Sequence, residues 1–316
     1  MAVYTHITEP ELRDYLQVFP LPPLQDFSGI AAGVSNTNYL LRFTDGLKLI
    51  LTIFEERTPT ADLPYYMALM EHLAAFSIPC PRPLRTREGE ALHEVAGRVA
   101  AMVSFVPGQS VLQPDAFQCA AMGTMLALMH RAVTDFPLKR ANSMNSATWI
   151  ELLTRSDDGS RKHQDMLHLA YQIAAQWPLH LPAGAVHADL FPDNVFFADR
   201  QLCGVIDFYF ACHDLLAYDL AIALNAWCVL PNGQLCPSRA RSLLHAYHTG
   251  RPLQAEETAA MPLLLQAAAL RFYASRHFDL IHCPPNALVT PKDPAEFERI
   301  LAAHCDNPLA FQAWLA

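Results

Sequence analysis

A short stretch in the second half of the chain carries residues suited to moving a phosphoryl group. It reads His187-Ala188-Asp189-Leu190-Phe191-Pro192-Asp193-Asn194, and the triplet Asp207-Phe208-Tyr209 begins thirteen positions after Asn194. Phosphoryl transfer requires a group that orients or deprotonates the attacking hydroxyl, together with hard oxygen ligands for Mg²⁺. We expect Asp189 to do the first task, with His187 beside it, and Asn194 and Asp207 to hold the metal.

The spacing of these residues is that of a kinase catalytic loop followed by its metal-binding aspartate. A chance match is the alternative, because H-x-D and D-F pairs are common in proteins. Two apolar segments, 195–198 and 203–207, follow the loop and are predicted to be strands joined by a turn at 199–200. Such a turn would return residue 207 to the neighbourhood of residue 194.

Two departures from protein kinases indicate a small substrate. Ala188 stands where those enzymes have an arginine that pairs with a phosphorylated activation loop. Only eleven residues separate Asp207 from Asp219, which leaves no room for a long segment that could hold a peptide.

The elements around the loop predict an α+β protein of two lobes. Expected helices cover 8–19, 67–76, 115–133, most of 148–176 and most of 214–316, and expected strands cover 39–44, 47–54 and 99–106. A capping box at Thr8 and Glu11 opens the first helix, and Asp45–Gly46 marks a hairpin turn. We expect residues 1–106 to be a nucleotide-binding lobe and residues 107–316 a catalytic and substrate-binding lobe.

Candidate ATP-binding residues lie in the first lobe. The loop that contains Gly33, Ser35, Asn36 and Thr37 has glycine and hydroxyl groups that suit phosphate, although the same residue types dominate ordinary turns. Ser104 and Val106 end the last strand of this lobe, where a backbone hinge would pair with adenine; a plain buried strand is the other interpretation.

The phosphate-binding lysine of kinases is missing from its expected strand position, where Thr52 stands. Lys48 lies on the same strand face, but four residues of strand span roughly 13 Å, so it is expected to be a solvated side chain. Glu71 remains open between a kinase-type helix glutamate and an exposed surface residue.

The chain resembles the aminoglycoside phosphotransferase and choline kinase superfamily, through residues 187–194, Asp207 and residues 218–221. Within it, the chain is similar to the homoserine kinases of that type, through residues 33–39, 206–212, 270–276 and 292–294. The resemblance covers nearly the whole chain. It implies a bilobal protein-kinase-like fold, ATP and Mg²⁺ as cofactors, and phosphorylation of the L-homoserine hydroxyl in threonine biosynthesis. It also implies that His130 is structural and that Asp219 braces the catalytic loop.

A homoserine carboxylate needs a fixed cation, and arginine suits it best. Arg271 and Arg276 are the candidates; they point about 140° apart on one helix, so at most one is expected to enter the pocket. Arg276 has Asp279 within reach as a surface partner, which favours Arg271. Tyr209 is the third substrate candidate.

Other functions remain open at this point. Tyr209, Phe210 and Trp227 would allow an aromatic cage for choline, and ethanolamine, an aminoglycoside or a sugar are further acceptors of the same chemical class. A catalytically dead nucleotide-binding module is a different hypothesis, prompted by the missing lysine.

Composition narrows the class of protein. The chain has 316 residues, 52% of them hydrophobic, and a formal charge of −9, so it lacks the basic footprint that nucleic acid requires. No signal peptide or membrane span is recognisable, and a cytoplasmic location is expected. The eight cysteines form no C-x-x-C pair and are expected to be free thiols; the sequence leaves the oligomeric state open.

Overall fold

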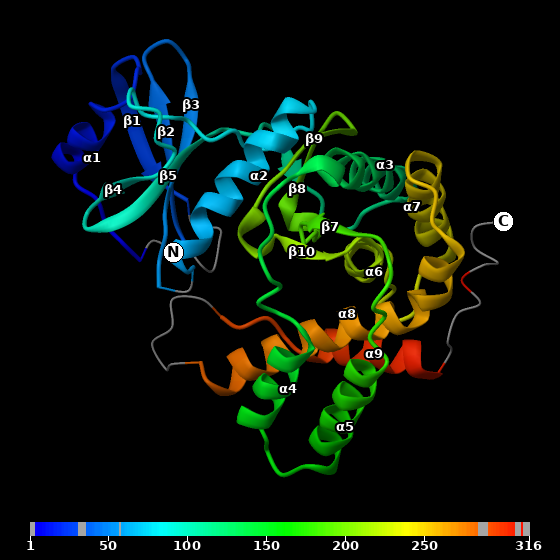
Figure 1. Cartoon of the computed structure of the whole chain (residues 1–316). Coiled ribbons are helices and arrows are strands. Elements are labelled where there is room, and N and C mark those ends of the chain that lie inside the picture. The colour runs from blue at the N-terminus through cyan, green and yellow to red at the C-terminus, as the bar shows by residue number, and fades with distance from the viewer. Residues whose placement is uncertain (1–3, 31–35, 57, 284–289, 307–310, 312–316) are drawn as a thin grey trace. The chain divides into compact units, whose positions relative to one another are not determined.

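A computed structural model describes residues 4–30, 36–56, 58–283, 290–306 and 311. The chain divides into two compact units, which Figure 1 shows with their elements labelled. The first unit comprises Met1–Pro107 together with Gly204–Tyr209, and the second comprises Gly108–Cys203 and Phe210–Ala316. The chain therefore leaves the first unit after Pro107 and returns to it for one short segment.

The first unit is built on an antiparallel sheet with the strand order β1-β2-β3-β5-β4. The strands are β1 (Leu24–Gly29), β2 (Thr37–Phe43), β3 (Lys48–Ile53), β4 (His93–Val95) and β5 (Arg98–Ser104). Every second residue of β2 is buried, which is the pattern of a strand with one face on a core. Leu12 and Tyr15 of helix α1 (Glu9–Leu16) join that core.

Local signals explain how these elements begin. The predicted capping box is confirmed, because the Thr8 side chain and the Glu11 side chain each accept from the other residue's backbone N–H. Gly46 has a φ of +88° in the predicted hairpin turn. Helix α2 (Leu63–Ala75) begins before the predicted residue 67, after the 3₁₀ turn η1 (Thr60–Asp62), and its proline occupies the first turn, where no intrahelical N–H is needed.

The second unit is mostly helical. Its helices are α3 (Ala116–Ala132), α4 (Ser146–Arg155), α5 (Arg161–Ala175), α6 (Leu216–Trp227), α7 (Pro237–Gly250), α8 (Ala255–Ile281) and α9 (Ala295–Asp306). The segment 148–176, predicted to be mostly helical, is two helices, because Gly159 adopts a φ of +72° between them and Ser160 caps α5. Helix α8 packs against α4, α6 and α9 (Figure 1).

Two helices approach closely at a glycine. Gly123 of α3 faces α7, and a Cβ atom on it would lie 2.2 Å from the carbonyl oxygen of Leu243. Backbone-to-backbone contact of this kind is possible only for glycine.

Small sheets frame the loop of residues 187–194. Strand β7 (Ala183–Val186) leads into it and pairs with β10 (Cys212–Leu215), and a second sheet has the order β6 (Gln109–Ser110), β8 (Val195–Ala198), β9 (Gln201–Val205). Short 3₁₀ turns lie at η2 (Val133–Asp135), η3 (Pro192–Asn194) and η4 (Phe208–Phe210). The strand predicted at 203–207 was misplaced: β9 ends at Val205, so Asp207 lies beyond it, in a left-handed backbone conformation.

The antiparallel sheet of the first unit and the helices of the second confirm the predicted α+β class. All eight cysteines are free thiols. None of the helices in the described part of the chain combines the length and apolar character that a bilayer crossing requires.

Candidate active site

The loop between β7 and β8 brings the three predicted catalytic residues together. The Asn194 side-chain amide donates to the Asp189 carbonyl at 2.8 Å and to its carboxylate Oδ2 at 3.3 Å. The Asp189 backbone N–H points to His187 Nδ1 at 3.3 Å. The nitrogen of the Asn194 amide is thus used inside the loop, which leaves its oxygen as the atom of the type that Mg²⁺ prefers.

The backbone of this loop is strained beside the Asp189 carboxylate. Ala188 has a φ of +64°, in the left-handed region that non-glycine residues rarely adopt. Such a conformation costs about 1–3 kcal/mol and persists only where the surroundings hold it in place. The side chain of Asp189 therefore depends on contacts that restrain its preceding residue.

Helix α6 supplies two of these contacts. The buried carboxylate of Asp219 accepts from the backbone N–H of His187 at 3.0 Å and from that of Ala188 at 2.8 Å. Trp227, at the end of the same helix, donates its indole N–H to the Leu190 carbonyl at 2.9 Å. The predicted bracing role of Asp219 is confirmed by these hydrogen bonds.

A buried polar network holds Asp219 in turn. His130 Nε2 lies 3.2 Å from the Asp219 carboxylate, and its Nδ1 lies 2.7 Å from the Tyr247 hydroxyl. Arg251 donates to that hydroxyl and pairs with Glu257 at 2.9 Å. Burial alone would raise the pKa of Asp219, but hydrogen bonds from His130 and the loop outweigh it and lower that pKa. The network therefore keeps the carboxylate ionised.

The electrostatics of Asp189 suit a group that takes up a proton. Burial raises the pKa of its carboxyl group, and the positive charges of Arg271 and His187 act in the opposite direction. A raised pKa makes a carboxylate a stronger base, provided that it stays deprotonated at the working pH.

Arg271 reaches the same loop from α8. Only 2% of this residue is exposed, and its guanidinium donates to the carbonyl of Ala188. The guanidinium carbon lies 4.5 Å from the ring centroid of Phe272 and 5.7 Å from that of Phe210. The predicted role of Arg271 in binding a substrate carboxylate stays a prediction, and these contacts give the side chain a partner within the protein.

Arg276 was expected to pair with Asp279, and the structure shows a different partner. It pairs with Glu296 of α9 at 2.6 Å, because α8 and α9 lie side by side, and its guanidinium carbon lies 6.0 Å from the ring centroid of Phe191. Lys292 lies 5.6 Å from that ring and pairs with Asp193. Two cations thus flank a ring two positions after Asp189. The sequence drew attention to Lys292 only through a resemblance, since its neighbours are distant along the chain.

Asp207 and Tyr209 group with the first unit. Asp207 is exposed and has a φ of +66°. Tyr209 packs edge-on against the rings of Phe54 and Tyr66, at centroid distances of 5.2 and 5.7 Å, and burial raises its pKa. Its substrate-binding role stays a prediction.

A magnesium site would draw on few protein ligands. No cluster of three or more His, Cys, Asp or Glu residues in the described ranges could hold a metal. The amide oxygen of Asn194 and the exposed carboxylate of Asp207 are of the right type, and Mg²⁺ at kinase sites takes one or two protein ligands plus phosphate oxygens and water. Each residue thus has an oxygen of the type that Mg²⁺ takes, and a metal site formed by Asn194 and Asp207 stays a prediction.

The candidate phosphate loop is partly outside the described residues, since Gly33 and Ser35 both fall there. Asn36 and Thr37 are buried, and both anchor the residues after β3. The Asn36 side-chain oxygen accepts from the Glu55 backbone N–H at 3.1 Å, and the Thr37 hydroxyl donates to the Glu55 carboxylate at 2.7 Å. Their phosphate-binding role stays a prediction, and these side chains are already engaged with the protein.

The candidate hinge lies at the end of β5. The backbone N–H of Ser104 donates to the carbonyl of Arg82, and its hydroxyl accepts from the Arg82 N–H, both at 2.9 Å. Val106 is buried. An adenine contact at Ser104 or Val106 stays a prediction, and it would have to use groups other than the Ser104 N–H.

The side chains considered for the missing lysine have other partners. Lys48 is exposed at the start of β3, with its Nζ atom 5.5 Å from the ring centroid of Phe105. Thr52 is buried and donates to the Asn38 side chain at 2.7 Å. Glu71 pairs with Arg85 at 2.7 Å, so this glutamate has an arginine partner within the first unit.

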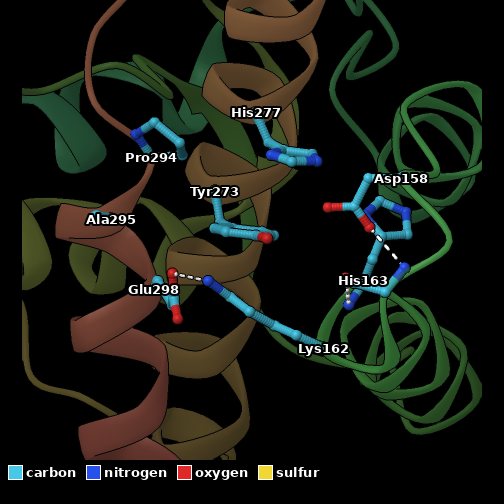
Figure 2. Close-up of a pocket in the computed structure, with 9 residues that line it drawn as sticks. Asp158, Lys162, His163, Tyr273, His277, Pro294, Ala295 and Glu298 are labelled. Atoms are coloured by element: carbon cyan, nitrogen blue, oxygen red, sulfur yellow. Dashed lines mark hydrogen bonds and ion pairs between the residues drawn. The ribbon is translucent and has the colours of Figure 1, made fainter.

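A separate cavity of about 180 Å³ lies between α5, α8 and α9, and Figure 2 shows its lining. Tyr273 and His277 of α8 stack on one side of it, and the Lys162–Glu298 ion pair crosses another. Tyr273 is two positions after Arg271, so it points about 200° away from it around the helix. None of residues 187–194 lines this cavity.

Comparison with known proteins agrees with the geometry of the loop. A model of the phosphotransferase enzyme family matches residues 26–257. The chain belongs to this family. A homoserine kinase of Xanthobacter autotrophicus is 47% identical over 309 residues, which is 96% of each chain. A homoserine kinase of Nitrobacter winogradskyi is 46% identical and covers 95% of this chain and 94% of its own.

Solved structures share the fold of this chain. An amicoumacin kinase, solved with AMP-PNP and Ca²⁺, matches with a TM-score of 0.76 at 17% identity, covering 98% of this chain and 97% of its own. This likeness supports the two-unit α+β architecture of the phosphotransferases.

Proposed function

We propose that the protein is a homoserine kinase, which transfers the γ-phosphoryl group of ATP to the hydroxyl of L-homoserine. The substrate oxygen bonds to the γ-phosphorus while the bond from that phosphorus to the β–γ bridging oxygen breaks. The hydroxyl proton passes to the Asp189 carboxylate, and ADP and O-phospho-L-homoserine leave. The substrate follows the curated relatives, which carry that name at 46–47% identity over nearly the whole chain.

The observation that carries this proposal is the held carboxylate of Asp189. Its loop is fixed through Asp219, Trp227 and Asn194, so the base is positioned before a substrate arrives. Positioning of this kind accounts for much of catalysis in phosphoryl transfer, where little covalent chemistry falls to the protein.

ATP and Mg²⁺ are the proposed cofactors. Residues 1–106 would bind the nucleotide, and residues 107–316 would supply the catalytic loop and the substrate site. The protein would work in the cytoplasm, where ATP is available. Asn194 and Asp207 would hold the metal, which neutralises phosphate charge when bound. The amicoumacin kinase with AMP-PNP and Ca²⁺ supports a nucleotide and a divalent cation in this fold.

The cations beside Phe191 support an anionic group on the substrate. Arg276 and Lys292 both lie near that ring, two positions after Asp189. A carboxylate placed there would compete with Glu296 for Arg276 and with Asp193 for Lys292, the carboxylates that pair with these cations in the protein. Arginine suits a two-point contact with such a group. We propose Arg276, with Lys292, as the partner of the homoserine carboxylate.

A panel of alcohols tests the function. ADP release should be measured with ATP and Mg²⁺ against L-homoserine, choline, ethanolamine, kanamycin and glucose, with the phosphorylated product identified by mass spectrometry. Homoserine should exceed each rival in kcat/KM by about 100-fold or more, because a site built for a carboxylate rejects analogues that lack it. A higher kcat/KM for choline or a sugar would assign that substrate instead.

A companion variant tests the metal. Asp207→Asn should lower turnover by at least about 100-fold at saturating Mg²⁺, because it removes the proposed metal carboxylate. Turnover within tenfold of the unaltered protein would remove Asp207 from the metal site.

A further inference from the structure

Ala188 is held on both sides by buried charged side chains. Asp219 of α6 accepts its backbone N–H at 2.8 Å, and Arg271 of α8 donates to its carbonyl oxygen. These partners lie 31 and 83 residues away along the chain. Two helices therefore hold a single residue, and that residue adopts the left-handed conformation directly before Asp189.

An arginine at position 271 lowers the stability of the folded protein, because its charge is buried. The side chain is 98% buried against Phe272 and Phe210, and among the described residues its guanidinium has no ion-pair partner. Asp189 and Asp214 interact with its charge through space. A buried charge without a close partner is less stable than an apolar side chain of similar volume, so its presence points to a role in activity.

We propose that Arg271 is a positioning residue for phosphoryl transfer: its hydrogen bond to Ala188 keeps the loop in the conformation that presents the Asp189 carboxylate to the substrate hydroxyl. Arg271 acts through the loop and does not itself bind the substrate. This inference rests on the proposed function only in assigning the base to Asp189.

Steady-state kinetics of Arg271 variants separate the two roles. Arg271→Met should lower kcat by about 10- to 150-fold, the range for losing a charge-assisted hydrogen bond, and should leave KM for homoserine and ATP within about threefold. Arg271→Lys should retain an intermediate kcat, because an ammonium can still donate to the same carbonyl. The matched control is Arg155→Met, since Arg155 also lies over a ring of α8, that of Phe278, but is exposed; its kcat should be unchanged.

A double-mutant cycle tests the connection to Ala188. Glycine enters the left-handed region without strain, so in an Ala188→Gly background the loop should need Arg271 less. Arg271→Met should then lower kcat by a clearly smaller factor than it does beside alanine. Equal factors in both backgrounds would show that the two positions act independently and would overturn the proposal.

Further results of these experiments would also show whether Arg271 positions the loop. A rise in KM for homoserine with unchanged kcat would make Arg271 a substrate-binding residue and overturn the proposal. If Arg271→Met fails to fold by circular dichroism, the same cycle is run with Arg271→Lys. If the unaltered protein does not phosphorylate homoserine, the proposed function fails, and the cycle is then run with whichever alcohol of the panel it accepts.

Discussion

The proposed role of Asp189 as a base depends on where its charge is placed. Its carboxyl group is desolvated, which raises its pKa, while the loop around it is fixed by groups of α6 and α8. A residue that accepts a proton only as the reaction proceeds contributes to the transition state more than to substrate binding.

Replacing Asp189 with Asn should therefore lower kcat far more than it weakens ATP binding. General-base catalysis contributes about 10²–10⁴ in rate, so kcat should fall by that range while the Kd for ATP changes by less than about threefold. The two quantities are measured by initial rates and by equilibrium titration with a fluorescent ATP analogue. A variant with weakened ATP binding and normal kcat would show that Asp189 contacts the nucleotide.

Lys48 should be dispensable for activity. It lies at the exposed start of β3 opposite Arg42, near the Asp45–Gly46 turn, and its charge rests over Phe105. Lys48→Ala should keep kcat and the KM for ATP within about threefold, since exposed substitutions away from a site have small effects. A loss above 100-fold in kcat/KM for ATP would show that this lysine serves the phosphates despite the roughly 13 Å to the usual strand position.

At the scale of elements, the contact of α3 with α7 depends on Gly123, which has no side chain to keep the two helices apart. Gly123→Ala would place a Cβ atom against the Leu243 carbonyl, and backbone cannot move aside as a side chain does. The variant should lose about 1–3 kcal/mol of unfolding free energy, the usual effect of overpacking. Urea denaturation measures this loss. Thr124→Ala, at the exposed neighbouring position on α3, is the control and should change stability by less than about 0.5 kcal/mol.

Elements with local signals were predictable, and those with distant partners were not. The capping box of α1 and the hairpin at Gly46 lie within a few residues of the elements they define. Strand β7 reads Ala-Gly-Ala-Val, with neither alternation nor bulk, and it is a strand only because β10 pairs with it.

In the candidate site, too, features set by neighbouring residues were predictable and contacts with distant residues were not. The spacing of residues 187–194 predicted that His187, Asp189 and Asn194 lie together, because those residues are neighbours in the chain. The contacts that hold the loop join it to α6 and α8, at separations of 31 to 83 residues. The partner of Arg276 was predicted wrongly for the same reason, since Glu296 comes from another helix.

At the scale of the whole molecule, one histidine should make stability depend on pH. His304 of α9 is buried, its Nε2 lies 2.8 Å from the Asn225 side-chain oxygen on α6, and burial lowers its pKa to about 4. Below its ordinary pKa of 6.5, the unfolded chain binds a proton that the folded protein does not. The stability that the protein gains by keeping His304 unprotonated is therefore present in full above pH 6.5, and it is lost as the pH falls toward 4.

His304→Gln should remove this pH dependence, because glutamine does not titrate. Between pH 7.5 and 4.5 the unaltered protein should lose about 2–3 kcal/mol more unfolding free energy than the variant loses. Urea denaturation at both pH values gives the comparison, and using the difference cancels the carboxylates that both proteins share. Parallel losses in the two proteins would mean that His304 is protonated without penalty in the fold.

The return of residues 204–209 to the first unit affects how the protein is made on the ribosome. Tyr209 packs on Phe54 and Tyr66, and the Val205 N–H donates to the Pro79 carbonyl, so the first unit is complete only when this segment has been synthesised. About a hundred residues of the second unit are translated in the meantime. At the usual rate of synthesis that is roughly 5–20 s during which the first unit lacks part of its core. The nascent chain should therefore show its greatest need for chaperones in that interval, and a gene truncated after residue 107 should yield a product that aggregates or is degraded.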